Sequence, residues 1–457
     1  MGISFLRDVF REKANSEAII WKGHSYHYSW LDEKVVFWLE WGKANGIRPF
    51  DVVLLQGEFS PSSISILLAL IELECIVVPL SADRAHEQCV FANTALVVWI
   101  LEVDSNDKVR LVHREETRKH SLYDSLRKAG HSGIVFFTSG STGISKAVVH
   151  DLEKLLKKYT LRRYDLRTLA FLLFDHIGGF DTLFYVLSNG SALVVPEVRT
   201  PLAVCQSIER YKVEVLPVSP SFLNLLLIGE VYKEYELNSL KFISYGAEVM
   251  PSNTLQRCME IFPKVRFLQK YGATEIGTMR SKSDQNNSVW VQIGGEGYNW
   301  RIVDGLLQIK CDSAMVGYLN APSPFTEDGW FITGDAVEQD GENLRILGRM
   351  SDIINVGGQK VYPAEVENAI CEMEGVADAT VYGEKNQLLG SIVCARVQLA
   401  MPVEKDEFVK KLKTHCKSRL ERYKLPLKIT FSSGSQTDAR SKKMRRFMSE
   451  GSDLKSI

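Results

Sequence analysis

A run of small polar residues, TSGSTGISK at positions 138–146, suits the chemistry of phosphate binding. Glycine allows backbone N–H groups to converge on an anion, hydroxyl groups donate further hydrogen bonds, and a lysine adds a point charge. The spacing is not that of the P-loop, because Gly140 and Gly143 are only three residues apart. By itself such a run is more often a solvated turn, so the interpretation depends on the residues that accompany it.

Three other polar loops follow apolar runs: FDHIGG (174–179), SYGAE (244–248) and KYGATE (270–275). Loops at the carboxyl ends of strands in an open parallel sheet meet in one crevice, where ligands bind. We therefore expect the four loops to bring glycines, hydroxyl groups, His176, Glu248 and Glu275 together. Taken alone, His176 is more often a structural histidine and Glu275 a helix-cap or surface carboxylate.

Two charged residues further along the chain extend this pattern. Asp335 in WFITGD could bind paired ribose hydroxyls, as an acidic residue does in other nucleotide sites. Arg349 in ILGRMSD adds a permanent cation with bidentate geometry. Singly, these residues are more often a turn former and a member of a surface ion pair. Beside the four loops they favour a nucleotide site.

The elements that must position these loops alternate between short β-rich runs and helical patterns from about residue 50 to 270. The apolar runs are continuous rather than alternating, which is typical of parallel sheets covered on both faces. The stretch 63–80 contains Glu72 and Glu74, and predicts a buried helix followed by a strand rather than a membrane span. Helices are predicted at 61–73, 201–211 and 252–262, and strands at 51–55, 75–80, 95–101, 133–137, 169–174, 192–195, 213–218, 240–244 and 265–269.

The C-terminal third has a different texture. Glycine and aspartate punctuate predicted strands at 301–310 and 342–348. From about 350 a small βαββαβ-like unit follows, with helices at 363–373 and 404–420 and strands near 377–382, 391–398 and 427–431. The predicted fold class is α/β: a large N-terminal region with parallel sheets covered by helices (1–349), plus a small α+β C-terminal domain (350–457).

Composition narrows the function classes. The 457 residues are enough for two or three domains, and 45% hydrophobic with 24% charged residues is typical of a soluble globular protein. A formal net charge of −1 gives no general attraction for nucleic acid or an acidic membrane. Residues 1–10 lack a basic region followed by an apolar stretch, so we expect no secretory signal. Eight cysteines without a C-x-x-C pair, and scattered histidines, predict a cytoplasmic protein without a zinc site.

Five stretches occur in order along the chain: TSGSTGISK, YGATE, WFITGD, GRMSDIINVGGQKVYPAEVE and the terminal SKKMRR. In this order and spacing they resemble the signature series of the adenylate-forming superfamily of acyl- and aryl-CoA synthetases, peptide-synthetase adenylation domains and beetle luciferases. The resemblance extends from about residue 10 to 446. It implies an enzyme in which a carboxylate attacks the α-phosphate of ATP, giving an acyl-adenylate and pyrophosphate, after which a thiol displaces AMP.

The resemblance also implies roles for individual residues. Thr274 would contact the α-phosphate, and Glu275 would hold Mg²⁺ with Thr138 as a second contact, since one carboxylate plus phosphate oxygens is ordinary magnesium chemistry. Asp335 would bind the ribose hydroxyls, assisted by Arg349. The rest of the implied ATP site comprises Ser139, Gly140, Ser141, Thr142, Gly143 and Lys146 on the β- and γ-phosphates, Tyr245, Gly246, Ala247 and Glu248 along the adenine, and Tyr271 and Gly272.

The basic tail ARSKKMRR (439–446) would alone be a solvated or nucleic-acid-binding charge run. The resemblance instead implies a lysine that bridges the carboxylate and the α-phosphate, where a cation stabilises crowded negative charge. Lys442 fits best. Ser441 stands where glycine is usual and the preceding proline is missing, so Lys443 remains an alternative.

The small C-terminal domain of this superfamily rotates between the two half-reactions. One orientation brings in the lysine, and the other presents residues 355–363 beside a thiol channel. Gly357 and Gly358 would let a pantetheine arm pass close to the backbone. The hinge position is Ser351, where aspartate or lysine is commoner.

The acid to be activated is only partly defined. His176 falls where synthetases often carry a gate beside the incoming carboxylate. Ile177 occupies the position where amino-acid-activating domains place an aspartate against the α-ammonium, so an α-amino acid is disfavoured, although Asp175 and Asp181 lie nearby. The mostly apolar pocket segments suit an aliphatic or aromatic acid. Predicted substrate-binding residues are His176, Ile177, Gly178, Ser219, Tyr245 and Gly272.

Several functions remain open at this stage. The leading hypothesis is an AMP-forming acid–CoA ligase that uses ATP, Mg²⁺ and CoA. A stand-alone enzyme that loads a carrier-protein phosphopantetheine would use the same residues. A non-catalytic adenylate-binding relative would explain the altered tail and hinge, and a nucleic-acid-binding role resting on the tail is weaker, because the rest of the chain supplies no basic face.

Overall fold

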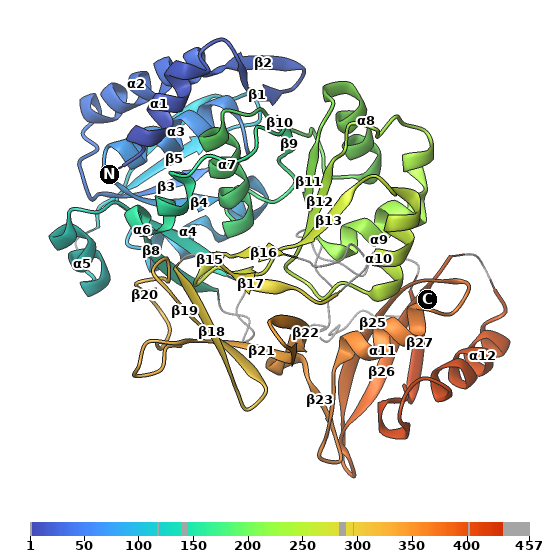
Figure 1. Cartoon of the computed structure of the whole chain (residues 1–457). Coiled ribbons are helices and arrows are strands. Elements are labelled where there is room, and N and C mark those ends of the chain that lie inside the picture. Colours follow the sequence, from blue (N-terminus) through green and yellow to red (C-terminus); the bar gives the residue numbers. More distant parts are fainter. Residues whose placement is uncertain are drawn as a thin grey trace, which may run out of the picture.

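The computed structural model of the chain describes residues 2–116, 118–138, 145–282, 289–295, 297–400 and 403–432. Two seven-stranded sheets and a separate five-stranded sheet dominate the fold (Figure 1). This confirms the predicted α/β class, with parallel sheets in the N-terminal region and a small α+β unit after it.

The first sheet has the order β13-β12-β11-β9-β10-β1-β2. All neighbouring strands are parallel except the β1–β2 hairpin. Its strands are β1 (Glu17–Trp21), β2 (His24–His27), β9 (Thr168–Leu169), β10 (Leu193–Val195), β11 (Val215–Val218), β12 (Phe242–Tyr245) and β13 (Arg266–Gln269).

The second sheet has the order β20-β8-β7-β4-β3-β5-β6. Its four central strands are parallel, and the antiparallel strands lie at the two edges. Its strands are β3 (Val52–Gln56), β4 (Ile76–Leu80), β5 (Trp99–Val103), β6 (Val109–His113), β7 (Gly133–Thr138), β8 (Lys146–Asp151) and β20 (Gly317–Tyr318).

Helices cover both faces of each sheet. The largest core lies between the sheets, and alternate strand residues point into it from both sides, as Ile19 and Val53 do. Their neighbours Ile20 and Val52 face the two outer cores. The inner helices are α1 (Ser4–Glu12), α2 (Tyr28–Ala44), α3 (Pro61–Glu72) and α7 (Ile177–Asn189); the outer ones are α8 (Pro201–Tyr211), α9 (Pro220–Gly229) and α10 (Ser252–Ile261) on the first sheet, and α4 (Gln88–Thr94) and α5 (Ser121–Ala129) on the second.

Smaller strands connect the sheets to the C-terminal domain. The pairs β14 (Gly272–Ala273) with β15 (Gly277–Thr278), and β16 (Arg280–Lys282) with β17 (Gln292–Gly294), follow β13. A four-stranded antiparallel sheet then contains β18 (Tyr298–Val303), β19 (Leu306–Cys311), β21 (Phe331–Asp340) and β22 (Asn343–Arg349). The single-turn elements are α6 (Leu152–Leu156), η1 (Ala82–Glu87), η2 (Lys157–Tyr159), η3 (Val231–Lys233), η4 (Met350–Asp352) and η5 (Arg422–Lys424).

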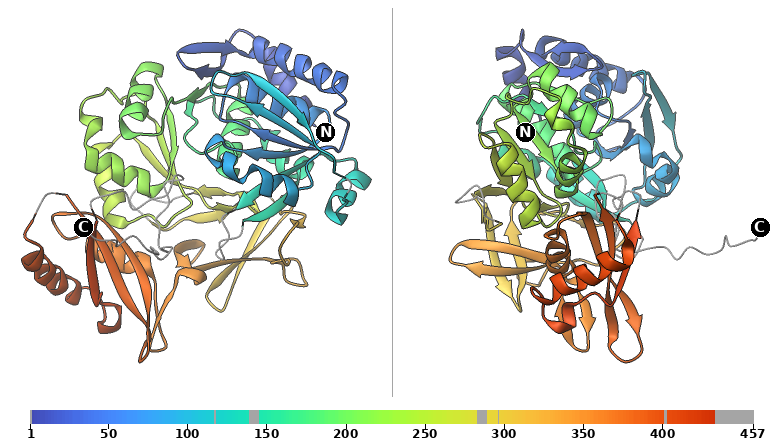
Figure 2. Two further views of the ribbon diagram at one scale, coloured as in Figure 1. Left: turned by 180° about the vertical axis from the view of Figure 1, so that it is seen from behind. Right: turned by 90° about the vertical axis from the view of Figure 1, so that its right-hand side faces the viewer.

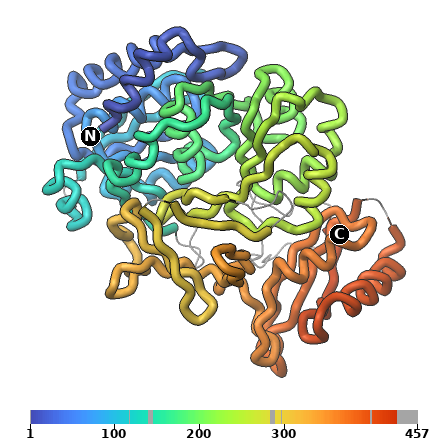
Figure 3. Tube along the Cα trace, viewed as in Figure 1, coloured from blue at the N-terminus to red at the C-terminus, as the bar shows by residue number. Residues whose placement is uncertain are grey.

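The C-terminal unit has its own hydrophobic core, drawn from residues 354–431. Figures 2 and 3 show it beside the α9–α10 end of the first sheet. The boundary at 349/350 stays a prediction, although every residue of this core follows it. The unit contains β23 (Ile354–Val356), β24 (Gln359–Val361), β25 (Val376–Asn386), β26 (Gly390–Leu399), β27 (Lys428–Ser432), α11 (Pro363–Cys371) and α12 (Lys405–Lys417).

Two expectations about the strands were wrong in detail. The run 169–174 is not a strand along its length: β9 ends at Leu169, and the following residues leave the sheet to reach α7. The run 95–101 begins at Ala95, the C-cap of α4, and β5 starts only at Trp99. In addition, the four polar loops do not belong to one open sheet, because 138–146 follows β7 of the second sheet and the others belong to the first.

Candidate active site

One cavity of about 350 Å³ lies where the two sheets meet the antiparallel sheet. Such a volume is within the range of small-molecule sites. Six residues that the sequence singles out line it: Thr138, Lys146, His176, Thr274, Glu275 and Arg349. The remaining lining residues are Phe136, Phe137, Asp175, Tyr318, Pro324, Phe331, Ile332, Thr333, Gly334, Met350 and Ser351.

Thr138 and Lys146 form the two ends of the predicted phosphate loop. They are direct partners in the β7–β8 register, so the hairpin fixes both ends of the loop at the cavity. The Nζ atom of Lys146 lies 5.0 Å from the centre of the Tyr318 ring, which is a cation–π arrangement. The intervening Ser139, Gly140, Ser141, Thr142 and Gly143 lie outside the described residues.

His176 occupies the N-cap position of α7. Its Nδ1 accepts a hydrogen bond from the backbone N–H of Gly178 at 3.0 Å, which orients the imidazole at the cavity. A Cβ at Gly179 would lie 2.0 Å from the carbonyl oxygen of Leu173, so only glycine allows this close approach. The helix start therefore holds His176 against the preceding chain.

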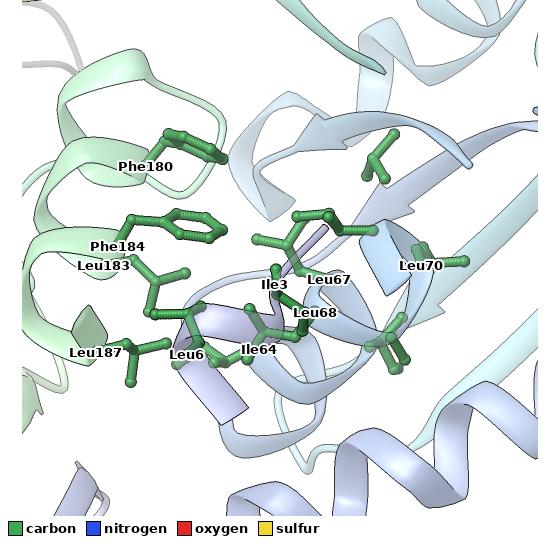
Figure 4. Close-up of a cluster of buried hydrophobic side chains, with 14 of the residues drawn as sticks. Ile3, Leu6, Ile64, Leu67, Leu68, Leu70, Phe180, Leu183, Phe184 and Leu187 are labelled. Carbon is green, nitrogen blue, oxygen red and sulfur yellow. The ribbon is translucent and has the colours of Figure 1, made fainter. Parts of the chain in front are cut away.

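The apolar face of α7 fixes its position. Phe180, Leu183, Phe184 and Leu187 recur at helical spacing and pack on Leu6 of α1 and on α3 (Figure 4). Because this face is buried in the core between the sheets, the N-terminus of α7 is anchored where the cavity needs it.

Glu275 and Thr274 lie in the loop between β14 and β15. The hydroxyl of Tyr318 donates to Oε1 of Glu275 at 2.6 Å. From β8, Nε2 of the fully buried His150 donates to the carbonyl oxygen of Thr274 at 2.6 Å. Burial lowers the pKa of His150 below its ordinary value of 6.5, so the imidazole that supports this loop is neutral.

Asp335 lies just behind the cavity lining, beside Gly334. It is 8% exposed, and it is the direct strand partner of Arg349. The hydroxyl of Tyr271 donates to Oδ2 of Asp335 at 2.6 Å, and Nε of Arg349 lies 3.3 Å from Oδ1. Burial raises the pKa of Asp335 above its ordinary 3.8, although the Arg349 guanidinium and the Tyr271 hydroxyl oppose this shift.

Other predicted site residues do not line this cavity. Tyr245 is buried in the core of the first sheet, and Ala247 has a left-handed backbone (φ 69°), which is uncommon for a residue with a side chain. Glu248 accepts hydrogen bonds from the N–H and Oγ of Ser221 at 3.2 and 2.6 Å. Ile177, Gly178, Tyr271 and Gly272 lie close to the lining in sequence, whereas Gly246 directly follows β12 and Ser219 is the N-cap of α9.

The glycines of the predicted thiol channel are outside the cavity lining as well. Gly357 and Gly358 form an exposed turn between β23 and β24, both with positive φ. Lys442, with its alternative Lys443, lies outside the described residues. The roles given to all these residues remain predictions.

Sequence reasoning missed several residues that line the cavity or support its lining. Tyr318 and His150 contact predicted residues from β20 and β8, but no motif surrounds either of them. Met350 and Ser351 line the cavity from the single turn η4. Ser351 was predicted only as the hinge position, and Met350 had no predicted role.

Within the described residues, no helix is long and apolar enough to cross a membrane. No group of three or more His, Cys, Asp or Glu side chains in this part of the chain could hold a metal by itself. One carboxylate, Glu275, and one hydroxyl, Thr138, do line the cavity. That donor set fits Mg²⁺ shared with the phosphates of a bound nucleotide.

Known proteins resemble this chain over 65% to 93% of its length. A 2-succinylbenzoate–CoA ligase from Listeria monocytogenes is 26% identical over 93% of the chain and 94% of its own length. A 3-[(3aS,4S,7aS)-7a-methyl-1,5-dioxo-octahydro-1H-inden-4-yl]propanoyl:CoA ligase from Mycobacterium tuberculosis is 33% identical over 65% of the chain. The match spans only 62% of this second relative, less than two thirds of its length.

Solved structures share the fold. The anthranilate CoA ligase AuaEII, solved with anthranoyl-AMP, superposes with a TM-score of 0.83 at 18% identity, covering 97% of this chain and 95% of that one. The o-succinylbenzoate CoA synthetase MenE from Bacillus subtilis, solved with its acyl-adenylate, gives 0.74 at 21% identity, covering 98% of each. Residues 6–305 match the AMP-binding enzyme family, and residues 365–443 match the AMP-binding enzyme C-terminal domain. The chain therefore belongs to the AMP-binding enzyme family.

Proposed function

We propose that this protein is an AMP-forming acid–thiol ligase that activates a carboxylic acid with ATP and transfers the acyl group to CoA. In the first step a carboxylate oxygen bonds to the α-phosphorus of ATP and the bond to pyrophosphate breaks. In the second step a thiolate sulfur bonds to the acyl carbon and AMP leaves. The full-length likeness to a CoA ligase and the two family matches support this proposal.

The observation that carries the proposal is the shared cavity. It brings a lysine, two threonines, a carboxylate, a histidine and an arginine together from five separate segments of the chain. Lys146 and Arg349 would balance the negative charge of a triphosphate, and Arg349 would assist Asp335 at the ribose. Glu275 and Thr138 would hold Mg²⁺, which when bound neutralises charge on phosphate oxygens.

His176 has a geometry that suits a gate for the acid. Its ring is oriented at the cavity by the hydrogen bond from the N–H of Gly178 to Nδ1, and the residue lines the cavity that the incoming carboxylate would enter. Ile177, at the next position, is buried and offers no partner for an ammonium group. We therefore infer an aliphatic or aromatic acid in preference to an α-amino acid.

The acceptor and the location are part of the same proposal. We favour CoA, and a carrier-protein phosphopantetheine is the alternative acceptor. All eight cysteines are free thiols, which agrees with the reduced, cytoplasmic setting that the sequence favours.

The test is release of pyrophosphate and AMP from ATP, with a panel of aliphatic, aromatic and amino acids, each with and without CoA. We expect acid-dependent release that CoA accelerates, together with a thioester product. An acyl-adenylate that forms but does not react with CoA would indicate a carrier protein as acceptor. If no acid causes release and ATP still binds, the protein is a binding-only relative.

A further inference from the structure

Arg84 lies in the single turn η1, which follows β4 of the second sheet. Its side chain is only 11% exposed, although the residue is not among those that line the cavity. A guanidinium stays charged at every working pH, so one that is nearly buried needs anions and carbonyl oxygens around it. None of the predicted motifs includes Arg84.

One side of this guanidinium is fixed close to its own turn. Its Nε and Nη2 atoms donate to the two carboxylate oxygens of Glu87, and the second of these hydrogen bonds measures 3.0 Å. The central carbon of the guanidinium lies 4.4 Å from the centre of the Phe91 ring, which is a cation–π contact. Phe91 in turn stacks on Phe137 of β7, with 3.8 Å between the ring centres. These contacts hold the guanidinium in one orientation against β7.

The other side of the guanidinium reaches the wall of the cavity. Its Nη1 atom is 3.5 Å from the carbonyl oxygen of Phe137, and Nη2 donates to Oγ of Ser145 at 3.3 Å. These two residues belong to the chain on either side of Thr138 and Lys146, which pair across the β7–β8 hairpin at the cavity. Nη1 also forms an ion pair with Oδ2 of Asp175 at 3.6 Å.

Asp175 lines the cavity, and its side chain is only 2% exposed. Among the described residues of the lining it is one of two carboxylates, and the other is Glu275, the predicted Mg²⁺ ligand. Glu87 is 29% exposed and can be solvated, so the charge of Arg84 matters most for Asp175. The proposed reaction brings the phosphates of ATP into this cavity, and a buried carboxylate there would repel them unless a cation balances it.

We propose that Arg84 is a positioning residue for ATP: it balances the charge of Asp175 and ties this carboxylate to the β7–β8 hairpin, so that the cavity accepts the phosphates. This inference rests on the proposed function. Arg84 would act from behind the wall, through Asp175 and the hairpin, and would not contact the nucleotide itself. Its loss should therefore matter more for a charged nucleotide than for an uncharged nucleoside.

The test compares the binding of ATP and of adenosine by calorimetry, since only ATP carries the charge that Asp175 would repel. The substitution Arg84→Met keeps an apolar stem and removes the guanidinium. We expect it to weaken ATP binding about tenfold, the size of one charge-assisted contact, and adenosine binding by less than about twofold. Arg84→Lys, which keeps the charge without the fork, should stay within about threefold of the wild type for ATP.

A double-mutant cycle with Asp175→Asn separates charge from packing. In the Arg84→Met chain, Asp175→Asn should raise the ATP affinity at least threefold, because it removes the unbalanced charge. In the wild-type chain the same substitution should raise it less, because Arg84 already balances that charge. A defect of packing would persist in the double variant. If Arg84→Met does not fold, Arg84→Gln takes its place in the cycle, since its neutral amide can still donate hydrogen bonds.

Arg127→Met is the matched control, because Arg127 also pairs with a carboxylate three residues away, Asp124 at 3.0 Å, but on the outer helix α5. It should bind ATP as the wild type does. The inference is overturned if Arg84→Met binds ATP like the wild type, if it weakens ATP and adenosine equally, or if Asp175→Asn helps both chains alike. In assays of AMP release with acid and CoA, Arg84→Met should raise the KM for ATP more than it lowers kcat. The expected cycle for ATP binding, in a wild type that releases no AMP with any acid, would uphold the role of Arg84 and overturn the proposed ligase.

Discussion

At the scale of single residues, Tyr318 connects two charged groups of the cavity. Its hydroxyl donates to Glu275 and the face of its ring lies under the ammonium of Lys146. Burial raises the pKa of Tyr318 well above the ordinary value of 10.0, so the hydroxyl stays a donor at any working pH. One side chain thereby positions both the predicted metal ligand and the predicted phosphate ligand.

The substitution Tyr318→Phe separates these two effects, because it keeps the ring and removes the hydroxyl. We expect the Mg²⁺ concentration for half-maximal AMP release to rise about three- to tenfold, as for the loss of one typical hydrogen bond of about 1 kcal/mol. Tyr318→Leu should in addition raise the KM for ATP, since the contact with Lys146 is lost. Tyr164→Phe, at an exposed tyrosine, is the control. An unchanged Mg²⁺ response in Tyr318→Phe would count against Glu275 as the metal ligand.

Asp335 shows a conflict between stability and binding. Because burial raises its pKa above 3.8, its contribution to stability is present below that pH and is lost as the pH rises through the folded-state pKa. Asparagine does not titrate. The difference in free energy of unfolding between Asp335→Asn and the wild type should therefore shift in favour of the variant as the pH rises from 4 to 7. The expected shift is on the order of 1 kcal/mol.

The same variant should lose at least tenfold in kcat/KM for ATP, because an amide NH2 replaces one of the two carboxylate oxygens that would accept from the ribose hydroxyls and the negative charge is lost. Chemical denaturation at several pH values and steady-state kinetics check the two halves. Parallel stability curves for the two proteins would contradict the assigned cause of the pKa shift.

At the scale of elements, sequence signals located the beginnings of helices better than the extent of strands. The predicted helices α3 and α8 begin with a serine or threonine N-cap followed by proline, a pattern readable in the sequence; α9 begins in the same way but was not predicted. The strand predicted at 169–174 failed because its apolar residues pack into cores from irregular chain, and periodicity cannot distinguish that from a strand. Tyr318 and His150 were missed for a related reason. Tyr318 lies on β20 and His150 on β8, and these two strands pair although they are far apart in the sequence.

Strand β8 supports the Thr274–Glu275 loop through His150. Because burial lowers the pKa of His150, the folded chain holds this imidazole neutral, and the unfolded chain takes up the proton first as the pH falls below 6.5. The wild type should lose up to about 1.4 kcal/mol of unfolding free energy per pH unit from this group. His150→Gln should flatten that part of the pH dependence.

The variant should also have a lower stability at pH 7, by about 1 kcal/mol, because the hydrogen bond to the Thr274 carbonyl is replaced or lost. The exposed His24→Gln is the matched control and should keep the wild-type slope. Denaturant titrations at pH 5.5, 6.5 and 7.5 measure the slopes. Equal slopes in all three proteins would exclude His150 as their source.

At the scale of the whole molecule, the motif order located the site but not its architecture. The four polar loops come from two sheets that face each other across a shared core, and no local pattern records which strands join which sheet. Only long-range packing brings these loops together.

Two side-chain amides of the N-terminal domain hold the C-terminal domain in its present orientation. Nδ2 of Asn224 in α9 donates to the carbonyl oxygen of Ala377 at 3.0 Å, and Nδ2 of Asn253 in α10 donates to that of Cys371 at 2.8 Å. Gly357 and Gly358 do not line the cavity in this orientation. If they present the thiol acceptor, as the resemblance implies, both hydrogen bonds must break before the second half-reaction.

The double variant Asn224→Ala/Asn253→Ala should therefore shift the domain equilibrium away from this orientation. Each hydrogen bond contributes about 0.5–1.5 kcal/mol, so the shift should be roughly tenfold. We expect the ratio of thioester formation to adenylate formation, measured by rapid quench, to rise by up to that factor. The melting temperature should hardly change, because each domain keeps its own core. Asn238→Ala, at an exposed asparagine whose amide donates to the nearby Glu236, should leave the ratio as it is. A ratio that stays constant or falls in the double variant would mean that these contacts do not limit the rotation.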